Sequence, residues 1–294
     1  MNYQWYPGHM TKAKRMMEEN IKLIDLVIEI VDARIPISSR NPDIDSLAVN
    51  KARIILLNKS DLADDKITNQ WINYFNENNI YCLKLNSRNN SGIKQVNGLI
   101  MTACADKIER NKQRGILNRP IRAMVVGIPN VGKSTFINSY AGKASAKTGN
   151  KPGVTKGKQW IKLNKNVELL DTPGILWPKF DNQEVGKRLD MIGSMNDEIL
   201  NVEELAIDTI KYIYSEYSDN VIERYGLDKE KTAASYDENA INPDNSVALY
   251  IMEQAAVKRG CIKKGNNIDY EKISNIILDD FRSGRLGRIS LETP

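Results

Sequence analysis

Short apolar runs recur along the first 180 residues of the chain, and each is bounded by polar or turn-forming residues. Runs of this length that are rich in Ile, Leu and Val predict strands buried on both faces of a sheet. They are centred on Ile28, Leu56, Leu83, Met124 and Leu169. Residues 159–163 predict an added strand at the edge of the same sheet.

Polar stretches with apolar residues at helical spacing separate these runs. They predict helices at residues 10–21, 71–78 and 92–110. Strands that alternate with helices are typical of a mostly parallel sheet flanked by helices. We therefore expect an α/β domain over residues 1–180.

The pattern changes after Pro178. Apolar residues then follow a helical spacing, and a further helix is predicted at residues 246–257, with its end at Gly260. The first of these helices is indicated by Leu205, Ile207, Ile210, Ile213 and Tyr217. Residues 181–294 therefore predict a second, small, all-helical domain.

The two predicted domains carry net charges of opposite sign, although the whole chain is only +5. Residues 1–180 contain 28 Lys and Arg against 15 Asp and Glu, whereas residues 181–294 contain 14 against 22. A run without acidic residues contributes Lys143, Lys147, Lys151, Lys156 and Lys158. Such a run suits a polyanion such as RNA, and an ordinary solvated loop is an equally good interpretation.

No apolar stretch reaches the length of a membrane span, and the first residues, with Trp5, Tyr6 and Pro7, do not resemble a secretion signal. The three cysteines are scattered without the spacing of a metal site, so we expect reduced thiols. These features predict a cytoplasmic protein that does not bind a membrane.

Residues 127–135 fit the pattern G-x-x-x-x-G-K-[ST] between a predicted strand and a predicted helix. In that setting backbone N–H groups surround a phosphate at the positive end of the helix. Lys133 is expected to reach the β- and γ-phosphates, and the Ser134 hydroxyl is expected to bind Mg²⁺. The alternative is an incidental strand–helix turn. The nucleotide contacts predicted in this loop are Asn130, Val131, Gly132, Lys133, Ser134 and Thr135.

A second motif, N-K-x-D, follows the strand predicted at residues 53–57. The carboxylate of Asp61 can accept hydrogen bonds from guanine N1–H and from the N2 amino group, a pair of donors that adenine lacks. The stem of Lys59 could cover the face of the ring. The alternative is a plain turn in which Asp61 caps a helix. The predicted guanine contacts are Asn58, Lys59, Ser60 and Asp61, with Asn86 and Ser87 near the guanine carbonyl.

The sequence Asp-Thr-Pro-Gly at residues 171–174 closes another predicted strand. Asp171 would lie behind a water bound to Mg²⁺, and the N–H of Gly174 could sense the γ-phosphate. Thr155, between the two phosphate motifs, is the candidate second hydroxyl ligand for Mg²⁺. A lone Thr in a Gly- and Pro-containing loop is otherwise an ordinary loop residue.

The order of these motifs is informative. In an ordinary small GTPase the phosphate loop comes first and the base-reading motifs come last, whereas here residues 58–61 precede residues 127–135. This order predicts a circularly permuted GTPase. The segment after Gly174 then leads directly into the predicted helical domain.

Over nearly its whole length the chain resembles the bacterial ribosome biogenesis GTPase A family. Besides the guanine and phosphate motifs, the resemblance rests on Trp5-Tyr6-Pro7-Gly8-His9-Met10, Val31-Asp32-Ala33-Arg34-Ile35-Pro36 and Asp280-Phe281-Arg282-Ser283-Gly284-Arg285-Leu286-Gly287-Arg288. It implies a GTP hydrolase that acts in late assembly of the large (50S) ribosomal subunit. In that role the protein binds pre-ribosomal RNA in the GTP state and is released on hydrolysis.

The group that orients the attacking water is not evident, because Ile175 stands where many GTPases carry a Gln. A single histidine is more often a packing or surface residue, but the resemblance implies that His9 takes part in hydrolysis. It also implies K⁺ in place of an arginine finger, held by the side-chain oxygen of Asn130. The alternative for Asn130 is a residue tolerated in a tight turn.

Charged residues outside the motifs fit either partners or structure. Asp32, Arg34 and Arg40 follow the first strand, where a structural ion pair is a more common role than contact with a partner. Basic clusters near the end of the chain suit an RNA contact or a solvated surface, and they comprise Lys258, Arg259, Lys263, Lys264, Arg282, Arg285 and Arg288.

The expected partners are GTP or GDP and the precursor of the large ribosomal subunit with its rRNA, and we expect a monomer. One alternative function is a GTP-gated module that binds a non-ribosomal RNA. Another is phosphoryl transfer to a small acceptor, for which the sequence offers no further substrate-binding motif.

Overall fold

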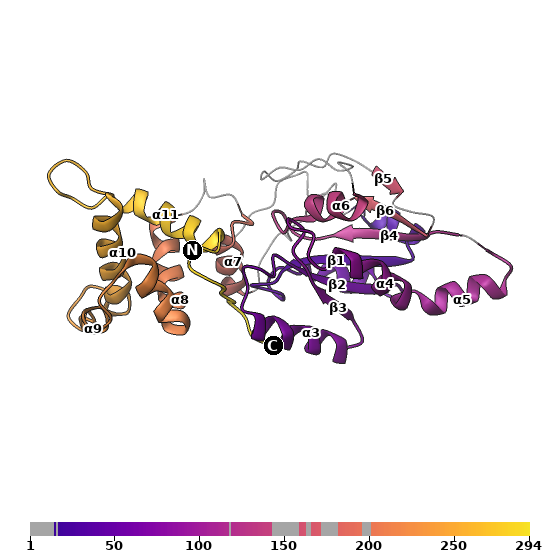
Figure 1. Ribbon diagram of the computed structural model, residues 1–294, viewed down its shortest axis with the longest axis horizontal. Helices are drawn as coiled ribbons and strands as arrows, with labels where there is room; N and C mark the ends of the chain where they lie inside the picture. Colours follow the sequence, from indigo (N-terminus) through magenta and orange to yellow (C-terminus); the bar gives the residue numbers. More distant parts are fainter. Residues whose placement is uncertain are drawn as a thin grey trace. The chain divides into compact units, whose positions relative to one another are not determined.

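The computed structural model describes residues 15, 17–117, 119–142, 159–162, 166–171, 182–195 and 201–294, with only the backbone of Gln159 and Asp171. The chain forms two compact units (Figure 1). The sheet unit comprises Met1–Gly186 and Glu292–Pro294, and the helical unit comprises Lys187–Leu291. The boundary predicted after residue 180 lies outside the described residues.

Within the described residues, the sheet unit contains a six-stranded sheet with the order β3-β2-β1-β4-β6-β5 (Figure 1). Neighbouring strands are parallel, except that β5 runs antiparallel to β6. The strands are β1 (Leu26–Asp32), β2 (Ala52–Asn58), β3 (Tyr81–Lys84), β4 (Ile121–Val126), β5 (Gln159–Lys162) and β6 (Val167–Asp171). The predicted mostly parallel sheet with an added edge strand is confirmed.

Strand β1 lies at the centre of this sheet, and all seven of its residues are buried. From β1 the strand order runs through β2 to β3 on one side, and from β4 through β6 to β5 on the other. The order therefore reverses between β1 and β4. In open α/β sheets, ligands bind outside the carboxyl ends of the strands at such a point.

The helices of the sheet unit bury their apolar sides. Helix α3 packs Trp71 and Phe75 into a core cluster that includes residues of β1 and β2. This helix begins at Asp65, earlier than predicted, because the side chain of Asp64 accepts a 3.0 Å hydrogen bond from Ile67 N–H. Asp61 therefore does not cap it. The helices are η1 (Ile21–Leu23), α2 (Asp43–Leu47), α3 (Asp65–Glu77), α4 (Ile93–Ala103), α5 (Ala105–Gln113) and α6 (Lys133–Ala141).

The prediction of one long helix over residues 92–110 is wrong. Helix α4 ends and α5 begins at Cys104, whose φ and ψ of −104° and 10° are not helical. The apolar positions that bury α4 end at Ile100, and α5 contains no buried residue. The spacing that anchors α4 is lost after Cys104, so nothing in the core requires the two helices to be continuous.

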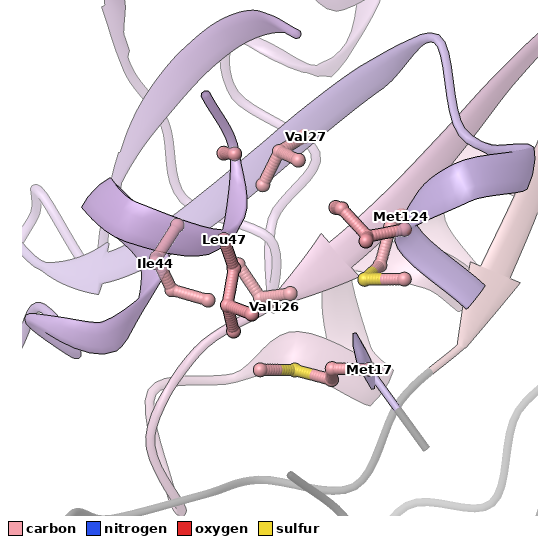
Figure 2. Close-up of a pocket in the computed structure, with 8 residues that line it drawn as sticks. Met17, Val27, Ile44, Leu47, Met124 and Val126 are labelled. Atoms are coloured by element: carbon pink, nitrogen blue, oxygen red, sulfur yellow. The ribbon is translucent and has the colours of Figure 1, made fainter. Parts of the chain in front are cut away.

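A small apolar cavity lies in the sheet unit between helical segments and the strands β1 and β4 (Figure 2). Its volume is about 10 Å³, roughly the room for one water molecule. The lining is Met17, Ile21, Val27, Ile44, Leu47, Ala48, Met124 and Val126. With no polar group in this lining and so little room, the cavity is a packing imperfection of the core.

The helical unit buries apolar residues between α8, α10 and α11. The predicted all-helical character and the helices at α8 and α10 are confirmed, whereas α11 was not predicted. Its central side chains include Ile210 and Ile213 of α8, Ile251 of α10 and Ile277 of α11. Helix α10 ends at Gly260, which has the left-handed φ of 66° that favours glycine. The helices are α7 (Gln183–Met191), which begins in the sheet unit, α8 (Val202–Tyr225), α9 (Lys229–Ala233), η3 (Pro243–Asn245), α10 (Ser246–Arg259) and α11 (Tyr270–Arg282).

A buried carboxylate, Asp280, joins the carboxyl ends of these helices. Arg224 at the end of α8 donates two hydrogen bonds to it, of 2.9 and 2.6 Å. Arg285 lies 3.2 Å and Arg259 lies 3.9 Å from the same carboxylate. The buried charge is thus compensated by three partly exposed arginines.

The remaining predictions about composition can be compared with the described residues. Cys82, Cys104 and Cys261 are buried free thiols, and burial raises the pKa of Cys82 and of Cys104 to about 12. These two are therefore poor nucleophiles. No group of three or more His, Cys, Asp or Glu that could hold a metal occurs among the described residues, and no helix described there could span a bilayer.

Candidate nucleotide-binding site

Two glycines let the loop after β4 approach its neighbours closely. At Gly127 a side-chain carbon would lie 2.6 Å from the carbonyl oxygen of Ile30 in β1. At Gly132 it would overlap Nδ2 of Asn58, and the φ of 91° is itself unfavourable for other residues. The loop therefore packs directly on β1 and on the start of the N-K-x-D motif, at the point where the strand order reverses.

The same loop leads into the N-terminus of α6. Asn130 has a left-handed φ of 62°, and Gly132 is the cap residue before Lys133, the first residue of the helix. The first N–H groups of a helix have no partner within it and form a positive end. Lys133 is 7% exposed, and Ser134 follows it on the first turn. This arrangement of N–H groups, an amine and a hydroxyl suits a polyphosphate with its metal ion.

Asn58 connects three loops through one side chain. Its Nδ2 donates a 2.7 Å hydrogen bond to the carbonyl of Val131 in the phosphate loop. Its Oδ1 accepts hydrogen bonds from the N–H and the hydroxyl of Ser87, at 3.0 and 2.9 Å. The hydroxyl of Ser139 in α6 donates to the carbonyl of Ser87 at 2.5 Å. The residues predicted to read the base and those predicted to hold the phosphates therefore form one connected structure.

Lys59 is held by a buried carboxylate. Its Nζ lies 3.0 Å from Oδ2 of Asp32, and Arg34 donates to both oxygens of Asp32 at 2.9 Å. Burial alone would raise the pKa of Asp32, but Arg34 and Lys59 outweigh it and hold that pKa well below its ordinary value. Burial and the charge of Arg34 lower the pKa of Lys59, although Asp32 opposes them. The Lys59 side chain is 25% exposed, so water still reaches this pair.

The other residues predicted to contact guanine, Ser60, Asp61 and Asn86, lie in ordered turns. Ser60 N–H donates to the carbonyl of Leu85 at 3.2 Å, and Asp61 next to it is exposed. Asn86 accepts hydrogen bonds from the N–H groups of Arg88 and Asn89, at 2.8 and 3.3 Å. The side chain of Asn86 thus shapes its own turn, while the carboxylate of Asp61 is accessible to a ligand.

Several predicted site residues lie outside the described residues. They are His9, Thr155 and Gly174, together with the five lysines between residues 143 and 158. Asp171 is described only by its backbone, at the carboxyl end of β6 beside β4. The structure therefore places the loops predicted to bind guanine and phosphates, and all the assigned contacts with GTP and Mg²⁺ stay predictions.

Two features near the site were not predicted from the sequence. One is the ion pair between Asp32 and Lys59. The other is Glu292, whose carboxylate accepts hydrogen bonds from the N–H of Ile37 at 2.8 Å and from the N–H and the hydroxyl of Ser38. The position of Asp32 at the end of an apolar strand could have indicated the ion pair. The contact of Glu292 leaves no signal in the local sequence, because its partner Ser38 is 254 residues away.

These two features are linked by Ser39. Its hydroxyl accepts a 3.0 Å hydrogen bond from the N–H of Asp32 and donates to the carbonyl of Ile35 at 2.7 Å. The indole N–H of Trp71 donates to the carbonyl of Glu292 at 3.2 Å. Glu292 is thus fixed to the loop that follows Asp32 and to helix α3.

The chain is similar to known proteins over its whole length. The Bacillus cereus protein named Ribosome biogenesis GTPase A is 46% identical over 294 residues, which is 100% of this chain and 95% of that protein. The chain belongs to the ribosome biogenesis GTPase A family. A family model described as 50S ribosome-binding GTPase matches residues 122–237 of this member, beginning in β4.

Solved structures agree with the assignment to the ribosome biogenesis GTPase A family. A GDP-bound structure of TM YlqF has a TM-score of 0.64 and 26% identity, and the match covers 95% of this chain and 99% of that one. A GNP-bound structure of YlqF from T. maritima has a TM-score of 0.61 and 26% identity, with 96% and 98% covered. The predicted permuted GTPase fold and the predicted GTP hydrolase are confirmed.

Members of this family, like P-loop GTPases in general, use Mg²⁺, which bridges the phosphates and neutralises their charge. Ser134 on the first turn of α6 is a fitting ligand, since hard cations prefer oxygen donors. Of the three predicted Mg²⁺ ligands, Ser134 is the one whose side chain belongs to the described residues, since Thr155 lies outside them and Asp171 is described only by its backbone.

Proposed function

We propose that this GTPase acts in late assembly of the large (50S) ribosomal subunit. It binds pre-ribosomal RNA in the GTP state and is released after hydrolysis. The observation that carries the proposal is the similarity to the B. cereus Ribosome biogenesis GTPase A over all 294 residues, through both the sheet unit and the helical unit.

In this proposal GTP is bound by the N-K-x-D loop and the phosphate loop, which the Asn58 side chain connects. Asp61 reads the guanine, Ser87 lies near its carbonyl, and Lys133 neutralises the β- and γ-phosphates. Ser134 would bind Mg²⁺ together with Thr155, while Asp171 would contact the ion through a water. The support for a joint site is the Asn58 side chain, which bonds both Val131 and Ser87.

Hydrolysis needs a group that orients water and a charge that stabilises the transition state. We assign the first role to His9, because Ile175 has no polar group. For the second we assign K⁺ bound beside Asn130, whose left-handed backbone lies in the phosphate loop. An arginine finger raises the rate of hydrolysis by roughly 10³–10⁵, so a cation that replaces it is expected to raise this rate strongly.

RNA contact is assigned to the basic end of the helical unit. Arg224, Arg259 and Arg285 surround Asp280 and keep 25%, 35% and 52% of their side chains exposed. Lys258 and Arg288 are exposed in the same stretches of chain. Since three arginines meet two carboxylates, the buried Asp280 and the exposed Asp279, this end keeps positive charge available for phosphates.

The test is GTP hydrolysis in KCl and in NaCl, with and without purified large subunits. We expect slow turnover alone and strong stimulation by the subunits in K⁺ only. The wild-type chain with small subunits is the control, since a general response to rRNA would stimulate there too.

Absence of stimulation, in protein shown to bind GTP, would overturn the ribosomal role and leave a GTPase. Salt-dependent binding to many RNAs with no stimulated turnover would favour the GTP-gated RNA-binding module. Equal stimulation in NaCl would remove K⁺ from the mechanism without affecting the ribosomal role.

A further inference from the structure

The carboxylate of Asp32 occupies an unusual position. Asp32 ends β1, and its Cα is paired with that of Asn58 at the end of β2, immediately before Lys59. Its side chain is fully buried, and its two oxygens accept three hydrogen bonds from Arg34, including one of 3.1 Å from the backbone N–H. The Nζ of Lys59 completes the set at 3.0 Å. A buried carboxylate thus reaches from one strand into the base-reading loop of the next.

Lys59 needs such an anchor. Its φ of 58° is left-handed, a conformation that is strained for a residue with a side chain. The loop is otherwise fixed at its start by Asn58 and in its middle by the hydrogen bond from Ser60 N–H to Leu85. Only the ion pair with Asp32 fixes the Lys59 side chain among the contacts that the structure describes for it.

We propose that Asp32 is a positioning residue for guanine recognition, which holds Lys59 and, through the Lys59 backbone, the orientation of Asp61. The inference rests on the guanine site described above. Arg34 has a supporting role, since a second cation keeps the buried carboxylate charged and therefore able to bind the Lys59 amine. Order in this loop before the nucleotide arrives reduces the entropy that binding must overcome.

The test compares GDP with inosine diphosphate, which lacks the 2-amino group that Asp61 reads. For Asp32→Asn we expect the dissociation constant of GDP to rise at least about tenfold and the preference for GDP over inosine diphosphate to fall at least about threefold. Because both nucleotides bind the same folded molecules, their ratio does not depend on the folded fraction. A purely structural role for Asp32 would leave that ratio unchanged.

Glu29 offers a matched control on the same strand. It is also buried, and it pairs with Arg40 and Arg53 at 3.1 and 3.4 Å without touching the base-reading loop. Glu29→Gln is expected to leave the preference for GDP at the wild-type value. An equal loss in both variants would mean that any lost ion pair on β1 disturbs the site, and it would overturn the proposal.

A second variant guards against failure to fold. Asp32→Asn combined with Arg34→Gln removes both members of the fully buried pair, so the Arg34 charge is not left buried without an anion. Lys59, whose side chain is 25% exposed, still loses its anchor. A wild-type ratio in either variant overturns the proposal. If the wild-type chain itself did not distinguish GDP from inosine diphosphate, the guanine site would be wrong and not only this inference.

Discussion

A single amide, that of Asn58, connects the loops of the predicted nucleotide site. Its Nδ2 and Oδ1 are both engaged, toward Val131 and Ser87 respectively. A residue of the same size without both a donor and an acceptor would leave buried polar groups unmatched, at about 1–3 kcal/mol each. At the scale of residues, the site is therefore defined by side chains that organise loops as much as by those that face the ligand.

Gly132 gives a direct test of the close approach between the two loops. In Gly132→Ala the new carbon would overlap Asn58 Nδ2, and the φ of 91° would be strained. We expect the affinity for GDP, measured with a fluorescent analogue, to fall at least about tenfold. Gly98→Ala in α4 is the control, because nothing lies within 4 Å of the added carbon, and it is expected to be neutral or stabilising. Unchanged affinity in Gly132→Ala would show that the loops can separate without loss.

His9 is tested by function alone, since it lies outside the described residues. His9→Ala is expected to leave GTP affinity near normal and to reduce subunit-stimulated turnover at least about tenfold, roughly 1.4 kcal/mol of barrier. Single-turnover hydrolysis at saturating GTP and saturating subunits measures this. Turnover equal to that of the wild type would exclude His9 from the reaction.

The motifs that predicted the GTPase fold and the family are local in the chain, whereas the contacts assigned to their single residues stay predictions. The Gly-Lys-Ser of residues 132–134 and the N-K-x-D motif keep their meaning in any fold that places them after a strand. The sequence did not predict the partner of Lys59, because Asp32 lies on another strand and the two members of an ion pair have no fixed separation along the chain. The sequence favoured structural ion pairs for Asp32, Arg34 and Arg40 without naming their partners. The structure pairs Asp32 with Arg34, and it pairs Arg40 with Glu29 and Asp45.

At the scale of elements, the strands were easier to predict than the limits of the helices. Strands of a parallel sheet are buried on both faces, so an apolar run marks them directly. Helix ends depend on individual caps, such as Asp64 at the start of α3, and on where packing stops, as at Cys104. Helix α5 has no buried residue and illustrates the second case.

The junction of α8, α10 and α11 at Asp280 gives a prediction for pH. Burial favours protonation of Asp280, but hydrogen bonds from Arg224 and Arg285 and the charges of Arg224 and Arg259 outweigh it, so its pKa lies below the ordinary value. A carboxyl whose pKa is lowered by folding stabilises the fold above its unfolded pKa of about 3.9 and loses that contribution as the pH falls further. We expect the free energy of unfolding to decrease below about pH 4, and to decrease less in Asp280→Asn.

At neutral pH, Asp280→Asn is expected to destabilise the helical unit by about 2 kcal/mol, at or below the low end for a buried pair because the arginines are partly exposed. Urea unfolding followed by circular dichroism measures both effects. Asp279→Asn is the control, since this neighbour is exposed and its 2.7 Å pair with Arg285 should contribute less than about 1 kcal/mol. Equal effects of the two substitutions would contradict the importance of burial at Asp280.

At the scale of the whole molecule, the helical unit is connected to the sheet unit at both of its ends. The chain leaves the sheet unit after Gly186 and returns to it at Glu292. The returning segment is fixed by hydrogen bonds from Ile37, Ser38 and Trp71 to Glu292. The helical unit is therefore an insertion in the structure of the sheet unit, and Glu292 completes the latter.

Glu292→Gln tests that completion. The Gln amide offers one acceptor oxygen and brings donors toward the N–H groups of Ile37 and Ser38, so we expect the free energy of unfolding of the sheet unit to fall by about 2–3 kcal/mol. Urea unfolding of the GDP-bound protein measures it. Thr293→Ala is the control, because Thr293 is exposed and follows directly in the chain. No difference between the variants would mean that the segment rests on the loop without stabilising it.

The bond between Ser38 and Glu292 also has a consequence for synthesis. Translation proceeds from the N-terminus at about 5–20 residues per second, so the 254 residues between these partners take roughly ten to fifty seconds to make. In this interval the N-K-x-D motif and the phosphate loop are synthesised, whereas the loop at Ser38 cannot yet bond the carboxylate of Glu292. The motifs of the predicted nucleotide site are therefore synthesised long before the residue that completes the sheet unit. A nascent chain interrupted within the helical unit would carry these GTP motifs in a sheet unit that lacks the bonds of Glu292 to Ile37 and Ser38.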